Sequence, residues 1–146
     1  MIPSSVKRLI TAKCCMVELT PLIKAWIRFA EEDWDDAQIL ARSGGKPRSI
    51  CFHAQQCIEK LFKAELMRLQ TIVPKTHNLR ELSRLLHEAD DSWQATSIDL
   101  NRLSLAAVDF RYPDPNEPDP EIEIALVIQI ASDLRLKLLQ RLGIEP

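Results

Sequence analysis

Four polar side chains recur at spacings that place them on one side of an α-helix. They are His53, Gln56, Lys60 and Lys63. At 100° per residue they fall within an arc of roughly 80°, with Ser49 on the same side and Glu59 at its edge. This polar stripe offers one imidazole, one amide and two ammonium groups, which suit a phosphate or a nucleotide. The solvated face of an amphipathic helix produces the same pattern, so the sequence leaves both interpretations open.

The four cysteines and three histidines do not form a metal-binding pattern. Cys14 and Cys15 are adjacent, so they cannot easily both bind one tetrahedral ion, and no Cys-x2-Cys pair exists. His53 and Cys57 are four positions apart with Cys51 nearby, but a cysteine on a helix is more often a small core residue. We therefore expect no metal site, no cofactor and no disulfide.

Three motifs occur in a fixed order along the chain. They are Gln56-Cys57-Ile58-Glu59-Lys60-Leu61-Phe62-Lys63-Ala64, then Pro74-Lys75-Thr76-His77-Asn78-Leu79, then Arg111-Tyr112-Pro113. In order and spacing they resemble the HEPN family, a nucleotide-binding domain of higher eukaryotes and prokaryotes. The resemblance covers roughly residues 20 to 142. It implies an all-α fold with a four-helix-bundle core, and a role for His77 in stabilising the turn before a helix.

The resemblance also implies a function. A HEPN protein of this kind is a small helical homodimer that acts as the partner of a minimal nucleotidyltransferase, often in a toxin–antitoxin pair, and binds nucleotide or RNA. Two alternatives are a metal-independent HEPN endoribonuclease with an atypical active site and a non-catalytic structural interaction module. In the interpretation as a partner protein that binds nucleotide or RNA, Arg111 and Tyr112 join the polar stripe. The expected ligand-binding residues are then His53, Gln56, Lys60, Lys63, Arg111 and Tyr112.

The ribonuclease motif of the family is absent from its usual place. Many HEPN ribonucleases carry Arg-x4-6-His, in which Arg stabilises charge on the phosphate and His transfers the 2′-hydroxyl proton. After Arg111, positions 116–118 hold Asn, Glu and Pro instead of His. Arg48 and His53 have the required spacing but lie about 140° apart on a helix, so they converge only if Arg48 precedes the helix. They are the candidate catalytic pair, although without the motif a binding protein is favoured over an enzyme.

Helical periodicity repeats in five segments, which predicts an all-α, up-and-down bundle of about five helices. Thr20 and Pro21 predict the start of the first helix, which ends at Gly44-Gly45. The second runs from about Pro47 or Arg48 to Leu69 and is apolar over more than half its circumference, as a central helix would be. Asn78, with Glu81 three residues later, predicts the cap of a short third helix.

The last two helices are predicted less directly. The fourth is expected over roughly Gln94 to Phe110. The fifth is expected to have Asp119 as its cap and Pro120 at its first position, and to end before Gly143. Residues 121–124 alternate like a strand, but the long stretch without a turn signal and the basic residues near its end favour a helix.

Length and composition describe one helix-rich domain of 146 residues. We assign residues 20–143 to it and regard residues 1–19 as a tail, either disordered or upstream of the true start. The net charge of −2 produces no global attraction to nucleic acid or to an anionic membrane. Lys13 interrupts the one run that could form a signal peptide, and no apolar run could span a membrane, so a cytoplasmic protein is expected. The apolar second and last helices predict a homodimer.

Overall fold

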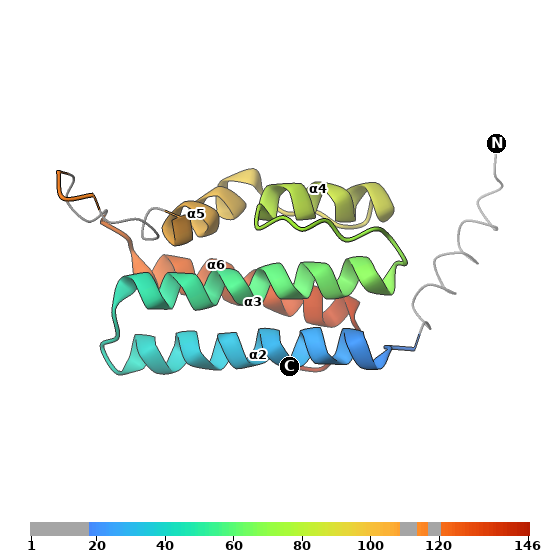
Figure 1. Ribbon diagram of the computed structural model, residues 1–146, viewed down its shortest axis with the longest axis horizontal. Helices are drawn as coiled ribbons and strands as arrows, with labels where there is room; N and C mark the ends of the chain where they lie inside the picture. Colours follow the sequence, from blue (N-terminus) through green and yellow to red (C-terminus); the bar gives the residue numbers. More distant parts are fainter. Residues whose placement is uncertain (1–17, 109–113, 117–120) are drawn as a thin grey trace.

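The computed structural model describes residues 18–108, 114–116 and 121–146, with the backbone alone for residues 105–108. These ranges contain five helices and no strand (Figure 1). The helices are α2 (Pro21–Arg42), α3 (Pro47–Arg68), α4 (Leu79–Ala89), α5 (Ser97–Val108) and α6 (Ile124–Arg141). The predicted all-α bundle is therefore confirmed. The tail expected over residues 1–19 lies outside the described residues, apart from its last two.

The first helix begins and ends where its sequence signals stand. The Thr20 hydroxyl accepts a hydrogen bond from the Ile23 amide at 3.2 Å, and Pro21 occupies the first helical position. After α2, Gly44 adopts a φ of 73°, which a side chain would disfavour. A Cβ on Gly45 would lie 2.8 Å from the Leu40 carbonyl oxygen, so the two glycines together allow the tight turn into α3.

The second helix is the centre of the bundle. It contacts α2, α4, α5 and α6. Figure 1 shows α4 and α5 on one side of it and α2 on the other. Fully buried residues of α3 include Ala54, Ile58, Leu61 and Phe62, as the periodicity predicts. Because α3 is largely enclosed, its buried polar residues must find partners within the chain.

The short fourth helix is held against α3 by a capped turn. The Asn78 side chain accepts hydrogen bonds from the amides of Arg80 and Glu81 at 3.0 and 3.3 Å, which confirms the predicted cap. The next helix begins at Ser97, three residues later than expected, because Thr96 caps it. The Thr96 hydroxyl accepts from the Asp99 amide at 3.3 Å, and its carbonyl accepts from the Leu100 amide.

The last helix also begins later than the sequence predicted. Residues 121–123 are not helical, and the Glu123 carbonyl accepts the first hydrogen bonds from Leu126 and Val127 at 3.0 and 3.1 Å. The residues of the strand-like alternation that precede Ile124 therefore form a non-helical segment that leads into α6. Ile122 of this segment packs on the core. Asp119 and Pro120, the expected cap and first position, lie outside the described residues. The predicted end is confirmed, because α6 stops at Arg141 just before Gly143.

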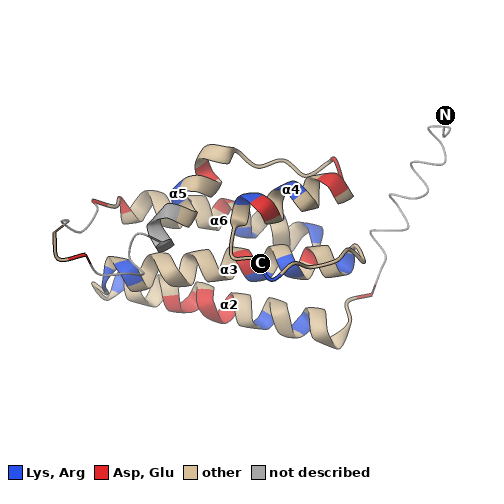
Figure 2. Cartoon of the chain, turned by 45° about the horizontal axis from the view of Figure 1, so that its top comes forward, with Lys and Arg blue, Asp and Glu red and all other residues tan. Residues whose placement is uncertain are grey.

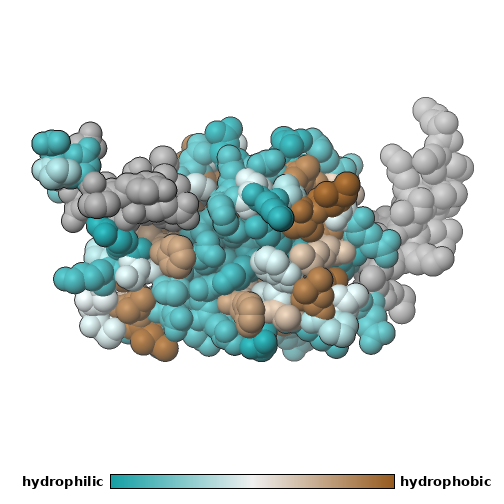
Figure 3. All heavy atoms as spheres, viewed as in Figure 1, coloured by the Kyte–Doolittle hydropathy of each residue, from teal (hydrophilic) through white to brown (hydrophobic). Residues whose placement is uncertain are grey.

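The homodimer was predicted partly from the apolar surface of the central helix, and the structure does not support that reason. A single chain already buries most of α3, and Phe52 is its one exposed large hydrophobic residue. The view in Figure 3 shows a mostly hydrophilic face with small, separate hydrophobic groups. On α2, however, Leu22 and Phe29 are exposed seven positions apart, so they share one face. The oligomeric state stays a prediction. None of the described helices is both long and apolar enough to cross a membrane.

Candidate functional site

The polar stripe on α3 meets an acidic residue of α2. Asp33 comes three residues after Ala30 and four before Ala37, so the helical period places it on the buried face of α2. There the His53 Nδ1 lies 2.8 Å from one Asp33 carboxylate oxygen, and the Lys60 ammonium forms an ion pair with the other. We call Asp33, His53 and Lys60 the Asp33 cluster.

The hydrogen bond to Asp33 fixes the protonation pattern of His53. A carboxylate only accepts, so Nδ1 must carry the hydrogen, and Nε2 of the neutral ring is then a bare acceptor. The His53 and Lys60 side chains are 27% and 23% exposed, so both reach solvent at the rim of the α2–α3 contact. The cluster therefore presents an oriented imidazole next to an ammonium group, which is a combination that can bind a phosphate or move a proton.

A second group of polar residues surrounds the buried carboxylate of Glu59. Lys63 donates to it at 2.9 Å, and the His77 Nδ1 lies 3.0 Å away. The amides of Gln55 and Gln56 add hydrogen bonds of 3.1 and 3.3 Å. We call these five residues the Glu59 cluster. Its four donors compensate the cost of burying a charge beside the core.

The Glu59 cluster changes the interpretation of Gln56 and Lys63. Both interpretations of the stripe place the Lys63 ammonium at the surface, but Lys63 is buried against Glu59, with its ammonium 5.9 Å from the centre of the Trp26 ring. Gln56 also bonds to Gln55 at 2.9 Å. The structure thus divides the stripe, so that His53 and Lys60 belong to one cluster and Gln56 and Lys63 to another.

His77 has the turn-stabilising position that the resemblance implied. Its ring contacts Glu59, and its backbone carbonyl accepts a hydrogen bond from the Gln55 side chain at 3.2 Å. These two contacts connect the turn before α4 to the middle of α3.

The remaining expected site residues are not brought to the stripe by the described part of the chain. Arg111 and Tyr112 lie outside the described residues. Arg48 is exposed and is the second residue of α3, so it does not precede the helix. The condition under which Arg48 and His53 would converge is therefore not met.

The described cysteines are buried free thiols. Burial raises the pKa of the Cys51 thiol to about 11, and it raises that of Cys57 further. Neither thiol is a nucleophile at neutral pH. Within the described ranges no three His, Cys, Asp or Glu side chains gather as metal ligands.

Two features of the charge arrangement escaped the sequence analysis. The first is Asp33, although an acidic residue at a core-facing helical position was a readable signal. The second is a buried network in which Glu65 accepts from Arg68 at 2.7 Å and from Arg141 at 3.0 Å, while Arg141 also reaches Asp90 at 2.7 Å. It connects α3, α6 and the segment after α4. No short motif marks it, because its members are far apart in sequence.

Acidic side chains gather in the middle of α2. Figure 2 shows this acidic segment, which includes Glu31, Glu32, Asp33, Asp35 and Asp36. Glu31 is paired with Arg135 of α6, at 2.8 Å from Nε, and hydrogen bonding to Glu31 raises the pKa of that guanidinium further. Asp35 and Asp36 are exposed and have no ion-pair partner among the described residues. The Asp33 cluster therefore borders a negative surface, which weakens its attraction for a polyanion.

Comparisons with known proteins place the chain in a family. The profile of the HEPN domain matches residues 23–136, which contain both clusters. The chain belongs to the HEPN family. A curated relative from Methanocaldococcus jannaschii, named "Putative toxin MJ1304", is 34% identical to this HEPN chain over 99 residues. The match covers 63% of this chain and 64% of the relative, which is less than two thirds of either protein. No solved structure matches the chain significantly.

Proposed function

We propose that this HEPN chain is the partner of a minimal nucleotidyltransferase in a cytoplasmic toxin–antitoxin pair, and that it binds nucleotide or RNA at the Asp33 cluster. The observation that carries the binding proposal is the pair of His53 and Lys60 at the solvent-accessible rim between α2 and α3. The name of the relative supports the toxin context. The family resemblance supports the nucleotidyltransferase partner.

Binding at this cluster should be weak and selective for short ligands. A phosphate must compete with Asp33 for Lys60, and the exposed Asp35 and Asp36 repel additional phosphates. Lys60 is the one lysine or arginine of the cluster, so about one phosphate can be engaged, and the log–log salt dependence of RNA binding should have a slope near −0.7, at ~0.7 per phosphate.

The test is fluorescence anisotropy of a short single-stranded RNA at several salt concentrations. Replacing Lys60 with Ala should flatten the slope by about 0.7. Lys63 should be left in place, because it is paired with Glu59 in the core and its loss would confuse binding with stability. Lys24→Ala, an exposed α2 lysine, is the matched control and should leave the slope unchanged. If Lys60→Ala binds RNA and nucleotide as the parent does, the Asp33 cluster is not the ligand site.

The partner proposal needs a separate experiment. Purification from the native host should bring a nucleotidyltransferase with the chain, identified by mass spectrometry. Charge reversal at Asp35 and Asp36 should weaken that complex if the acidic face of α2 contacts the partner. If no nucleotidyltransferase copurifies with either the parent or the variant, the partner role is contradicted.

We also propose that the chain forms a homodimer through the outer face of α2, where exposed Leu22 and Phe29 flank the half-buried Trp26. The protein should sediment at about twice its chain mass, and Phe29→Glu should shift it to the monomer. A parent that is already monomeric at micromolar concentration would contradict the dimer.

One specific observation favours the alternative of a metal-independent ribonuclease. The Asp33–His53 hydrogen bond orients Nε2 as a base that could accept a 2′-hydroxyl proton. The 2′ oxygen would attack phosphorus as its proton passes to His53 Nε2, and the 5′ oxygen would leave as a hydroxyl by taking a proton from solvent water, giving a 2′,3′-cyclic phosphate. Cleavage in the presence of a chelator should fall at least ~100-fold in both His53→Ala and Asp33→Asn, since the latter removes the fixed tautomer. Equal cleavage by parent and His53→Ala would assign the activity to a contaminant.

A further inference from the structure

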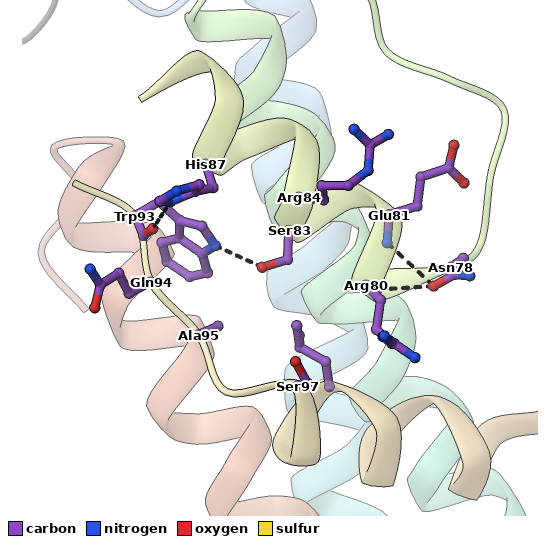
Figure 4. Close-up of a pocket in the computed structure, with 11 residues that line it drawn as sticks. Asn78, Arg80, Glu81, Ser83, Arg84, His87, Trp93, Gln94, Ala95 and Ser97 are labelled. Carbon is purple, nitrogen blue, oxygen red and sulfur yellow. Dashed lines mark hydrogen bonds between the residues drawn. The ribbon is translucent and has the colours of Figure 1, made fainter. Parts of the chain in front are cut away.

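A groove lies on the opposite side of the bundle from the Asp33 cluster. It runs between α4 and the segment that leads into α5, and its volume is about 640 Å³ (Figure 4). α4 and α5 cover one side of α3, whereas α2, which carries Asp33, covers the other (Figure 1). Ligand-binding pockets of proteins commonly have volumes of about 300–1,000 Å³. The groove is therefore large enough for a small organic molecule.

Three nitrogen-bearing side chains line the groove along one face of α4. Arg80, Arg84 and His87 are spaced by four and three residues, as one helix face requires. The Arg80 guanidinium has no hydrogen-bond or ion-pair partner among the described residues. Arg84 is paired with Glu88, but both side chains are largely exposed, so the pair is weak and easily exchanged for a ligand. Glu81 is the one acidic residue that lines the groove.

The polar groups of the groove floor have fixed hydrogen-bonding roles. The Trp93 indole donates to the Ser83 hydroxyl at 2.9 Å, so the hydroxyl hydrogen of Ser83 stays available for a ligand acceptor. The Trp93 carbonyl lies 2.8 Å from the His87 Nδ1, which must therefore carry its hydrogen and leaves Nε2 as an acceptor. Donors thus lie near Arg80 and Ser83, and an acceptor lies near His87.

The opposite wall supplies a helix end and apolar surface. Ser97 is the first residue of α5, and Figure 4 shows the Arg80 side chain extending toward it from α4. The positive end of a helix dipole favours an anion next to such a guanidinium. Ala95 and Leu100 add apolar contacts. The groove therefore has a positive end, an apolar wall and a separate hydrogen-bonding end.

We propose that this groove binds a phosphate monoester about the size of a nucleoside monophosphate. The phosphate lies between Arg80, Ser97 and the Ser83 hydroxyl, and the body of the molecule packs on Ala95 and Leu100. Its far end bonds to His87, which is seven residues, or ~10 Å, along α4 from Arg80. Arg84 adds a second positive charge near the entrance. The site is independent of the Asp33 cluster and of the function proposed for it.

The experiment uses the whole chain with AMP and with inorganic phosphate as probes, at low salt. Calorimetry should show AMP binding more tightly than phosphate, because only AMP reaches the apolar wall and His87. Arg80→Ala should weaken AMP binding about tenfold, as expected for loss of a charge-assisted contact. The matched control is Arg102→Ala, an exposed arginine of α5 that does not line the groove, and it should change AMP affinity less than about twofold.

A second readout places the ligand. The Trp93 indole hydrogen donates to Ser83, so its NMR resonance should shift when AMP binds and should respond less in Arg80→Ala. Lys60→Ala should leave the AMP-induced shift of the Trp93 indole resonance unchanged, because Trp93 lines this groove and not the Asp33 cluster. The proposal is overturned if millimolar AMP does not shift the indole resonance, or if Arg80→Ala binds AMP as the parent does. Binding of a single-stranded RNA but not AMP would also overturn it.

Discussion

Replacing Glu59 with Gln tests whether the motif that marks this family is structural in this chain. The substitution keeps the size of the side chain but removes the negative charge that faces Lys63. Lys63 would then keep its position beside the core without a carboxylate partner, with its ammonium 5.9 Å from the centre of the Trp26 ring. The amide of the new glutamine side chain would have one accepting oxygen and one donating NH2 group. The NH2 group would face a neighbouring donor and could not accept a hydrogen bond from it.

The expected cost follows from the burial of the pair. The Lys63 and Glu59 side chains are 9% and 5% exposed, and removing one partner of such a pair costs about 3–5 kcal/mol. We expect about 3 kcal/mol, near the lower end, because Lys63 can extend its ammonium toward water. The double variant Glu59→Gln with Lys63→Met removes the uncompensated charge, so it should recover at least about 1 kcal/mol of that loss.

The chain offers a matched control for the same substitution. Arg28 and Glu32 form an ion pair with the same spacing of four residues, but their side chains are 64% and 60% exposed. Glu32→Gln should therefore cost less than about 0.5 kcal/mol. Urea unfolding followed by circular dichroism measures the three variants against the parent. Equal stability of Glu59→Gln and Glu32→Gln would refute the reasoning, because burial of the Glu59 cluster would then have no energetic consequence.

Three further predictions concern stability and thiol chemistry. Burial raises the pKa of Asp90, but hydrogen bonds from Arg141 and Ser92 outweigh it and lower the value from 3.8 to about 2. The contribution of the Asp90 carboxylate to the free energy of unfolding is thus complete above pH ~4 and lost as the pH falls through ~2. The parent should be more stable than Asp90→Asn by about 1 kcal/mol after screening, and this difference should disappear over that pH range. Asn78→Ala should cost about 1 kcal/mol in urea unfolding, since it leaves two amides of α4 uncapped, and a loss below about 0.3 kcal/mol would contradict the cap. Cys57 should resist a thiol reagent in the folded protein and react in urea, as mass mapping of labelled peptides can show, because its thiol is buried.

Local signals predicted the helices well because their causes are local. The hydroxyl of Thr20 and the side chain of Asn78 cap their helices through amides two or three residues away, which sequence spacing reveals directly. Starts were predicted too early where the capping residue was less distinctive. Thr96 displaced the expected start at Gln94, and the backbone of Glu123 accepts the first bonds of α6.

The candidate site could be predicted only in part, because its partners come from other helices. The spacing of His53, Gln56, Lys60 and Lys63 correctly places them on α3, but it carries no information about which carboxylate each one meets. Asp33 lies 20 residues before His53, and the turn between the two helices decides that they meet. An acidic residue at a buried helical position was the available clue, since such a residue requires a donor partner.

The hydrogen-bond partners of the motif residues show which of them hold the fold and which remain available for a ligand. Gln56, Glu59 and Lys63 of the motif are occupied with one another and with the turn at His77, so they fix how α3 sits in the bundle. In this chain these residues constrain the fold, but they leave no charge free for a ligand. Any ligand chemistry must then come from side chains that keep a solvent-facing group, such as His53 beside Asp33 or Arg80 in the α4 groove. Changes at Glu59 should therefore reduce stability, with binding lost only on unfolding. Changes at Arg80 should reduce binding at unchanged stability, whereas changes at His53 should reduce binding at a small cost in stability, because Asp33 keeps its ion pair with Lys60.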